Sequence, residues 1–317
     1  MFLKAIGKSH AKIILIGEHS VVYGQPAIAL PITNVNMQAS VQPINHGRLI
    51  QSKYFIGEIK KVPSNMLGTK RLIQEILGSF HQNQAAFKIK ITSTIPSERG
   101  MGSSAATAIA VTRSLYHYFH RSLNHTQLLR VSNVEEKVTH GNPSGIDAAT
   151  AGSRLPVYFI PGKPIQSIPI NLNGSLVIAD SGVKGRTDIA VNSVHQEIEN
   201  HPTTGSMIIN RLGKLARGVK QDLKNNQIQQ LGQAMNQAQE YLSQLGVSTD
   251  KLNHLIKIAK QNGAYGAKLT GSGLGGCIIA LTPTQKAAQV ADHLLKAGAV
   301  NTWIQPFHLN GGFNHEV

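Results

Sequence analysis

The sequence predicts an α+β protein of two domains, and three observations support this. Its 317 residues exceed what a single hydrophobic core usually organises. Strand-like and helix-like patterns are mixed in both halves of the chain, as expected for α+β architecture. The composition also changes partway, because residues 155–178 hold four of the thirteen prolines. We therefore predict one domain over residues 1–170 and a second over residues 171–317.

The first half begins with the apolar stretch HAKIILI at residues 10–16, which predicts a buried strand ended by Gly17. FKIKIT at residues 87–92 alternates apolar and polar side chains, the pattern of a half-buried strand. Further strands are expected at residues 26–41 and 48–56, and helices at residues 68–80, 104–120 and 126–139.

The second half predicts short strands joined by turns over residues 155–178, followed by a helical region rich in Gln and Asn from about residue 185 to residue 260. The stretch AKLTGSGLGGCIIALT then predicts a strand, a glycine loop and another strand. A helix at residues 285–297 and a strand at residues 301–308 complete the chain.

The composition narrows the class of protein. Apolar residues make up 41% and charged residues 15%, which is typical of a globular chain. No apolar run reaches the roughly 20 residues of a membrane span, and the N-terminus lacks the pattern of a signal peptide. A single cysteine, Cys277, excludes an internal disulfide. We therefore expect a cytoplasmic protein without a membrane partner, in which Cys277 is a small buried residue.

The charge is strongly basic, with 31 Lys and Arg against 16 Asp and Glu. Such a balance suits a nucleic-acid partner when the cations cluster. Here they are scattered, and the densest spots are the pairs Lys60-Lys61 and Lys70-Arg71. We expect no nucleic-acid partner, although this remains the alternative from a different class of protein. The sequence leaves the oligomeric state open, and a homodimer is one option.

The stretch TIPSERGMGSSAATAIA at residues 94–110 places glycines and serines between a strand and a helix. A dinucleotide site would need an acidic residue about 20 positions later, but no Asp or Glu occurs between Glu98 and Glu135. A nucleophile elbow would need G-x-S-x-G, and the second glycine is missing. Two readings remain: an anion site at a helix N-terminus, or a turn capped by a serine.

A second glycine stretch, Gly271 to Gly276, also matches G-x-G-x-x-G. A strand follows it rather than a helix, so the dinucleotide reading fails there as well. We predict a hairpin-like glycine turn.

Two acidic residues are candidates for metal binding and proton transfer. The turn-forming segment HGNPSGIDAAT presents Asp147 at a loop–helix junction, and Glu136 lies at the end of the preceding helix. One or two carboxylates together with substrate phosphates commonly hold Mg²⁺. Glu135 competes with Glu136, but it points about 100° away around the helix, and we expect it to be solvated.

Lys12 lies within the first apolar strand, and Glu18 and His19 follow directly after that strand. A strand-end lysine either reaches solvent or pairs with an acid. Paired with Asp147 in a dry site, it would favour the ionised carboxylate and place positive charge beside a reacting oxygen.

In this order and spacing, the motifs resemble those of the GHMP kinases, a family of small-molecule kinases. The family's phosphate loop, P-x-x-x-G-L-G-S-S-A-A, corresponds to residues 96–106, with Met101 in place of leucine. The segments GEHSVVYG, HGNPSGID, SGVKGRT and KLTGSGLGGC also resemble family segments, and the likeness spans nearly the whole chain.

The resemblance implies an N-terminal domain like one in a ribosomal protein and a C-terminal ferredoxin-like domain. It implies an enzyme that uses ATP and Mg²⁺ to phosphorylate a primary hydroxyl of a small molecule. By resemblance, Asp147 is the base, Lys12 assists it, and Ser104 and Glu136 bind the metal. The implied nucleotide-binding residues are Pro96, Arg99, Gly100, Met101, Gly102, Ser103, Ser104, Ala105 and Ala106. The implied substrate contacts are Glu18, His19, Ser144, Asp147, Thr187, Gly271 and Ser272.

Overall fold

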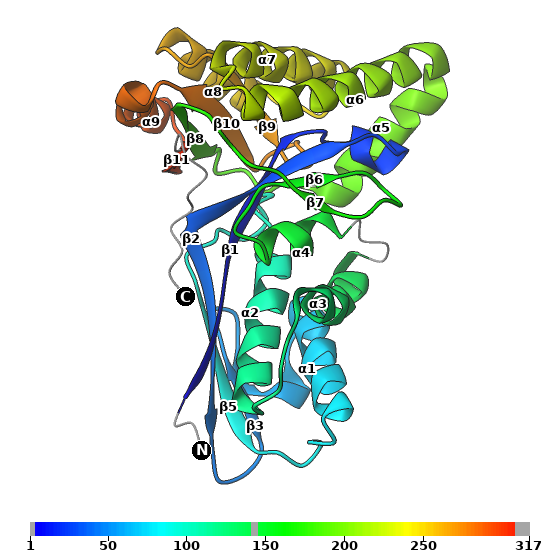
Figure 1. The fold of residues 1–317 in the computed structure, drawn as a ribbon, viewed down its shortest axis with the longest axis vertical. Helices are drawn as coiled ribbons and strands as arrows, with labels where there is room; N and C mark the ends of the chain where they lie inside the picture. Colours follow the sequence, from blue (N-terminus) through cyan, green and yellow to red (C-terminus); the bar gives the residue numbers. More distant parts are fainter. Residues whose placement is uncertain (1–3, 141–144, 308–317) are drawn as a thin grey trace. The chain divides into compact units, whose positions relative to one another are not determined.

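The computed structural model describes residues 4–140 and 145–307. The chain forms two compact units that interleave along the sequence (Figure 1). Unit 1 comprises residues 1–12, 31–96 and 102–154, and unit 2 comprises residues 13–30, 97–101 and 155–317. The last crossing therefore follows Arg154. The predicted division near residue 170, as a boundary between two contiguous domains, stays a prediction.

The sheet of unit 1 is built around strand β5 (Phe87–Ser93). It pairs antiparallel with the later part of β2 (Ala27–Pro43) and parallel with β3 (Arg48–Gln51), which pairs in turn with β4 (Ile56–Glu58). Strand β1 (Ala5–Ile16) pairs with β2. Phe87, Ile89 and Ile91 of β5 are buried, as the alternating pattern predicts.

The helices of unit 1 are α1 (Leu67–Ser79), α2 (Ser103–Tyr118), α3 (His125–His140) and α4 (Ile146–Ala151). In Figure 1, α1, α2 and α3 lie on the same side of the strands, and α2 packs against each of the other two. Small residues make this packing close, since Ala105, Ala106, Ala108 and Ala110 on α2 are fully or almost fully buried.

Unit 2 contains a four-stranded antiparallel sheet in the order β11-β8-β10-β9. Its strands are β8 (Gly174–Asp180), β9 (Gly266–Thr270), β10 (Cys277–Thr282) and β11 (Asn301–Phe307). Every residue of β8, β9 and β10 is buried. The first residues of β2 pair with β6 (Val157–Phe159), which pairs with β7 (Gln166–Ser167).

Five helices accompany this sheet in unit 2. Helices α7, α8 and α9 pack on its strands, and α5 and α6 extend the helical layer. Their bounds are α5 Thr187–Asn200, α6 Pro202–Lys224, α7 Ile228–Gln244, α8 Asp250–Gln261 and α9 Ala287–Lys296. The mixture of sheets and helices confirms the α+β prediction. No helix in the described part of the chain is long and apolar enough to cross a membrane.

Most predicted elements lie within a few residues of their expected positions. The glycine stretch 271–276 joins the antiparallel strands β9 and β10, so the predicted hairpin is confirmed. Cys277 has no exposed surface, and its burial raises the thiol pKa well above its usual range. The prediction of a small buried cysteine is therefore correct.

Candidate active site

Lys12 and Asp147 meet in unit 1. The ammonium nitrogen Nζ of Lys12, on β1, lies 2.9 Å from Oδ1 of Asp147 in the first turn of α4. The lysine side chain is 5% exposed and the aspartate side chain is 36% exposed. The buried cation thus holds a carboxylate that solvent or a ligand can still reach. An acid and a cation suited to proton transfer are brought together, as the sequence suggested.

Gly102 makes room for Lys12. Its backbone has a φ of +71°, a conformation that favours glycine. A Cβ atom there would lie 2.7 Å from Lys12 Cγ and 2.9 Å from Lys12 Cε. Two independent constraints therefore require glycine at this position, because the lysine stem passes directly over the turn that begins α2.

The start of α2 presents backbone N–H groups rather than a capped turn. The helix begins at Ser103, and Gly102, as the N-cap residue, makes no side-chain capping hydrogen bond. Of the two alternatives that the sequence left open, the turn capped by a serine is thus wrong. The first N–H groups of a helix lack partners within the helix, and the positive end of the helix dipole attracts anions. Ala105 and Ala106 are buried, and both backbone groups of Ala106 already bind within the protein, its N–H to the Gly102 carbonyl oxygen and its carbonyl oxygen to the Ser9 hydroxyl.

The carboxylate that contacts Ser104 is Glu135. The Ser104 hydroxyl lies 2.7 Å and 2.6 Å from the two Glu135 carboxylate oxygens, and the Thr139 hydroxyl donates to Oε1 at 2.9 Å. Glu135 is only 5% exposed. The expectation that it is solvated is therefore wrong, because α3 packs against both α1 and α2 and buries this side of the helix.

Glu136 is buried as well, and its environment raises its pKa to about 8. Desolvation is the main cause, followed by the negative charges of Asp147 and Glu135, while Lys12 acts in the opposite direction. Three carboxylates therefore share the neighbourhood of a single close lysine. This excess of negative charge can be compensated by a proton on Glu136 or by a bound cation.

Oxygen donors and excess negative charge suit Mg²⁺, which prefers oxygen ligands. The described residues include no group of three or more His, Cys, Asp and Glu side chains placed to hold a metal by themselves. This is compatible with magnesium, since the ion usually keeps waters and substrate phosphates in its coordination shell. The oxygens of Ser104, Glu135 and Glu136 suit magnesium by their chemistry, and the carboxylate in contact with Ser104 is Glu135. Ser104 and Glu136 as the metal ligands stay a prediction.

Unit 2 holds the segment that follows β1. The Glu18 carboxylate forms an ion pair with Lys268 of β9, and neither side chain has any exposed surface. His19 is 6% exposed, and its Nε2 donates to the Ser272 carbonyl oxygen at 2.9 Å. Burial lowers the pKa of His19, so the neutral form, with Nδ1 as an acceptor, is favoured at neutral pH. The sequence analysis assigned no role to Lys268, although this lysine begins the segment KLTGSGLGGC.

The glycine turn of unit 2 approaches the first part of the 94–110 stretch. A Cβ atom on Gly271 would lie 3.3 Å from Gly100 Cα, and one on Gly276 would lie 3.0 Å from the Arg99 carbonyl oxygen. Arg99 is held by Asp180, with Nε 2.8 Å from Oδ1. The Arg99 side chain, predicted to bind nucleotide, is therefore already committed to a carboxylate within the protein.

The predicted segment SGVKGRT also reaches this turn. The Thr187 hydroxyl lies 3.1 Å from the Ser272 hydroxyl, and Gly185 N donates to the Glu98 carbonyl oxygen at 2.8 Å. Residues 97–101, residues 181–187 and the glycine turn at residues 271–276 are thus in contact within unit 2.

Three further residues are predicted to bind nucleotide or substrate. Met101 is buried in unit 2, and Pro96 is half-buried in unit 1. Ser144 lies outside the described residues.

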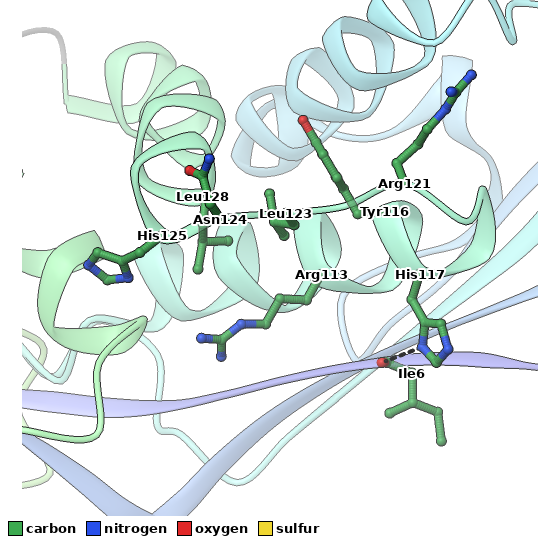
Figure 2. A pocket seen from close by; sticks show the side chains of 9 residues that line it. All are labelled: Ile6, Arg113, Tyr116, His117, Arg121, Leu123, Asn124, His125 and Leu128. Atoms are coloured by element: carbon green, nitrogen blue, oxygen red, sulfur yellow. Dashed lines mark hydrogen bonds between the residues drawn. The ribbon is translucent and has the colours of Figure 1, made fainter. Parts of the chain in front are cut away.

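A separate cavity of about 540 Å³ opens beside the C-terminal half of α2 (Figure 2). Three of the basic side chains that line it already contact protein groups. Arg113 donates to the Lys8 and Gly152 carbonyl oxygens, Arg121 lies over the Phe80 ring, and His117 contacts the Ile6 carbonyl oxygen. We therefore assign this cavity no ligand. It is lined by Ile6, Arg113, Tyr116, His117, Arg121, Leu123, Asn124, His125 and Leu128.

Two known domain families match the chain, one in each half. Residues 67–153 match the GHMP kinases N terminal domain, and residues 219–300 match the family described as GHMP kinases C terminal. The N-terminal match includes Ser103, Ser104, Glu136 and Asp147.

Individual relatives match over almost the full length. The chain is 30% identical to the mevalonate kinase of Thermococcus sibiricus, over 94% of this chain and 95% of the relative. The crystal structure of mevalonate kinase from methicillin-resistant Staphylococcus aureus is 31% identical, with a TM-score of 0.76, and the match covers 98% of this chain and 100% of that one. The Methanococcus jannaschii mevalonate kinase structure is 25% identical, with a TM-score of 0.83, over 96% and 98% of the two chains.

Proposed function

The chain belongs to the GHMP kinase family, and on that premise we propose that it transfers the terminal phosphoryl group of ATP to the primary hydroxyl of mevalonate, giving 5-phosphomevalonate. Two observations support this choice within the family. Mevalonate kinases match at 30–31% identity over almost the whole chain, whereas a phosphomevalonate kinase and a galactokinase match its structure at 17% identity. In addition, the segments GEHSVVYG at residues 17–24 and HGNPSGID at residues 140–147 resemble those of mevalonate kinases.

The observation that carries the proposal is the Lys12–Asp147 pair. Asp147 is ionisable, partly exposed and held at 2.9 Å from a buried cation. We assign Asp147 as the base that accepts the proton of the substrate hydroxyl as its oxygen attacks. Lys12 holds the Asp147 carboxylate in an ion pair and places a positive charge next to the developing negative charge. Because phosphoryl transfer relies mainly on positioning and electrostatics, this arrangement supplies what the chain itself must provide.

Bound ATP with Mg²⁺ would supply the phosphoryl group and neutralise charge on its oxygens. Ser104 and Glu136 are the residues we propose to hold the metal. The backbone of residues 100–106, with the N-terminus of α2, is the part we propose to hold the phosphates. On the substrate side we propose His19, Thr187, Gly271 and Ser272, because their contacts gather them in one part of unit 2.

The proposal is tested with purified protein, ATP, Mg²⁺ and mevalonate, with the phosphorylated product measured by ³¹P NMR. Asp147→Asn should lose nearly all turnover and stay folded. The matched control is Asp292→Asn, which removes a carboxylate from an exposed ion pair with Lys296 on α9. The control should retain wild-type turnover. No product from the wild-type protein would refute the proposed reaction.

The same purified protein distinguishes the proposed function from two alternatives. Phosphomevalonate kinase or mevalonate diphosphate decarboxylase would act on a phosphorylated substrate, so turnover of phosphomevalonate without turnover of mevalonate would favour a rival of the same fold. A nucleic-acid-binding protein would show steeply salt-dependent affinity for nucleic acid and no kinase activity. We expect mevalonate to be the substrate, and we expect the enzyme in the cytoplasm, as its single, buried cysteine suggests.

A further inference from the structure

The backbone at Glu18, His19 and Ser20 is strained. His19 has a φ of 58° and a ψ of −49°, and Ser20 N donates to the Glu18 carbonyl oxygen at 2.6 Å. This is a γ-turn with positive φ, the rarer and more strained of the two forms. A non-glycine residue keeps such a conformation only where surrounding contacts enforce it.

Two side chains of β9 and one backbone carbonyl of the turn after it supply contacts to this segment. Thr270 Oγ1 accepts from Ile14 N at 3.0 Å and donates to the Ile14 carbonyl oxygen at 2.8 Å. Lys268 pairs with Glu18, and the Ser272 carbonyl oxygen accepts from His19. Lys268, Thr270 and Ser272, alternate residues of one strand and the turn that follows it, therefore contact three points of the segment from Ile14 to His19.

The Lys268–Glu18 pair is the strongest of these contacts. Neither side chain has any exposed surface, and Lys268 Nζ also donates to the Leu269 carbonyl oxygen at 2.6 Å. Removing one partner of such a pair leaves a charge buried without compensation, which is far more costly than losing a surface pair. The lysine thus fixes the carboxylate of the residue that directly precedes His19.

We propose that Lys268 is a positioning residue, which acts through its ion pair with Glu18 to hold the γ-turn and so orients His19 toward the substrate. Glu18 then serves as the buried partner of Lys268, in place of the substrate contact that the sequence suggested. This inference rests on the proposed function, in which His19 is a substrate-side residue.

The first test is Lys268→Met, with two readouts. The KM for mevalonate should rise about 10- to 100-fold, since small misplacements of a binding group have effects of that size. The KM for ATP should change less than about threefold. In hydrogen–deuterium exchange, a peptide covering residues 17–24 should exchange faster, because Ser20 N loses its protection.

The matched control is Leu281→Ala, on the neighbouring strand β10, where Leu281 is fully buried. It should destabilise the same sheet without accelerating exchange in residues 17–24 or changing the KM for mevalonate. If Leu281→Ala produces the same changes, or if Lys268→Met changes stability alone, Lys268 is a structural residue and the inference is wrong.

If Lys268→Met fails to fold, the double variant Glu18→Gln with Lys268→Met replaces the test, because it leaves no buried charge unpaired. We expect it to fold and still to show the raised KM and the faster exchange. A double variant with wild-type KM and wild-type exchange overturns the inference. Hydrogen–deuterium exchange can be measured whether or not the protein has kinase activity. A wild-type protein that does not phosphorylate mevalonate would therefore refute the proposed function and still leave the role of Lys268 decidable.

Discussion

Lys12 Nζ lies 2.9 Å from Asp147 Oδ1, although one residue comes from the first strand and the other from the fourth helix. If the two act together, their substitutions should not be additive. We expect Asp147→Asn to lower kcat by about 10²- to 10⁴-fold and Lys12→Met by about 10²- to 10³-fold. The double variant should be little worse than Asp147→Asn alone. Steady-state kinetics of the three variants decide this, and simple multiplication of the two effects would show independent roles.

Gly102→Ala should lower kcat, because the added methyl group must displace the Lys12 side chain. Gly47→Ala is the matched control, since Gly47 has a φ of +77° and no atom within 4 Å of a Cβ atom built there. Both variants should lose about 1–2 kcal/mol of unfolding free energy, the usual cost of a side chain in this conformation, and Gly102→Ala should lose more, because its methyl group also clashes with Lys12. Only Gly102→Ala should lose activity at saturating substrate. Equal kinetic losses in the two would contradict the steric account.

Glu136→Gln and Glu135→Gln should differ in their magnesium requirement. We expect Glu136→Gln to raise the Mg²⁺ concentration for half-maximal activity about 10- to 100-fold. Glu135→Gln should have a smaller effect, since an amide oxygen can still accept the hydrogen bond from Ser104. Titration of activity with Mg²⁺ at fixed ATP measures both. A larger shift in Glu135→Gln would assign the metal to the other carboxylate.

Stability without divalent cations should depend on the protonation of Glu136. The native pKa of about 8 lies above the ordinary value of 4.5, so the native state binds more protons than the unfolded state between these two pH values. The unfolding free energy should therefore fall as pH rises through this window, by up to about 1.4 kcal/mol per pH unit. Denaturant unfolding in EDTA at several pH values measures this slope. Glu136→Gln should remove most of it, and an unchanged slope in that variant would refute the assignment.

The sequence predicted most elements because their signals are local. HAKIILI and FKIKIT showed their strands through apolar runs and alternation, and the glycine turn showed its hairpin through the strand that follows it. The Lys12–Asp147 contact, in contrast, could not be predicted from local signals. The motifs suggested both residues, but only the folded chain of unit 1 brings them together.

Two features of the site depend on tertiary packing and could not be read locally. Helical direction separated Glu135 from Glu136, but both side chains are buried, so direction did not predict exposure. Lys268 begins the segment KLTGSGLGGC, but nothing local indicated its partner Glu18, which reaches it from a distant part of the chain. The interleaving of the two units likewise arises because β1 and β2 each contribute residues to both.

At position 19, the residue that would best stabilise the fold differs from the residue that we propose contacts the substrate. Glycine would adopt its backbone conformation freely, whereas a residue with a side chain pays about 1–3 kcal/mol for such a conformation. A redesign that ranked substitutions by stability alone would therefore replace this histidine early, and would discard the imidazole for which we propose the strain is maintained. Efforts to make this enzyme more heat-resistant should leave residues 18–20 untouched and look to exposed turns such as that at Gly47.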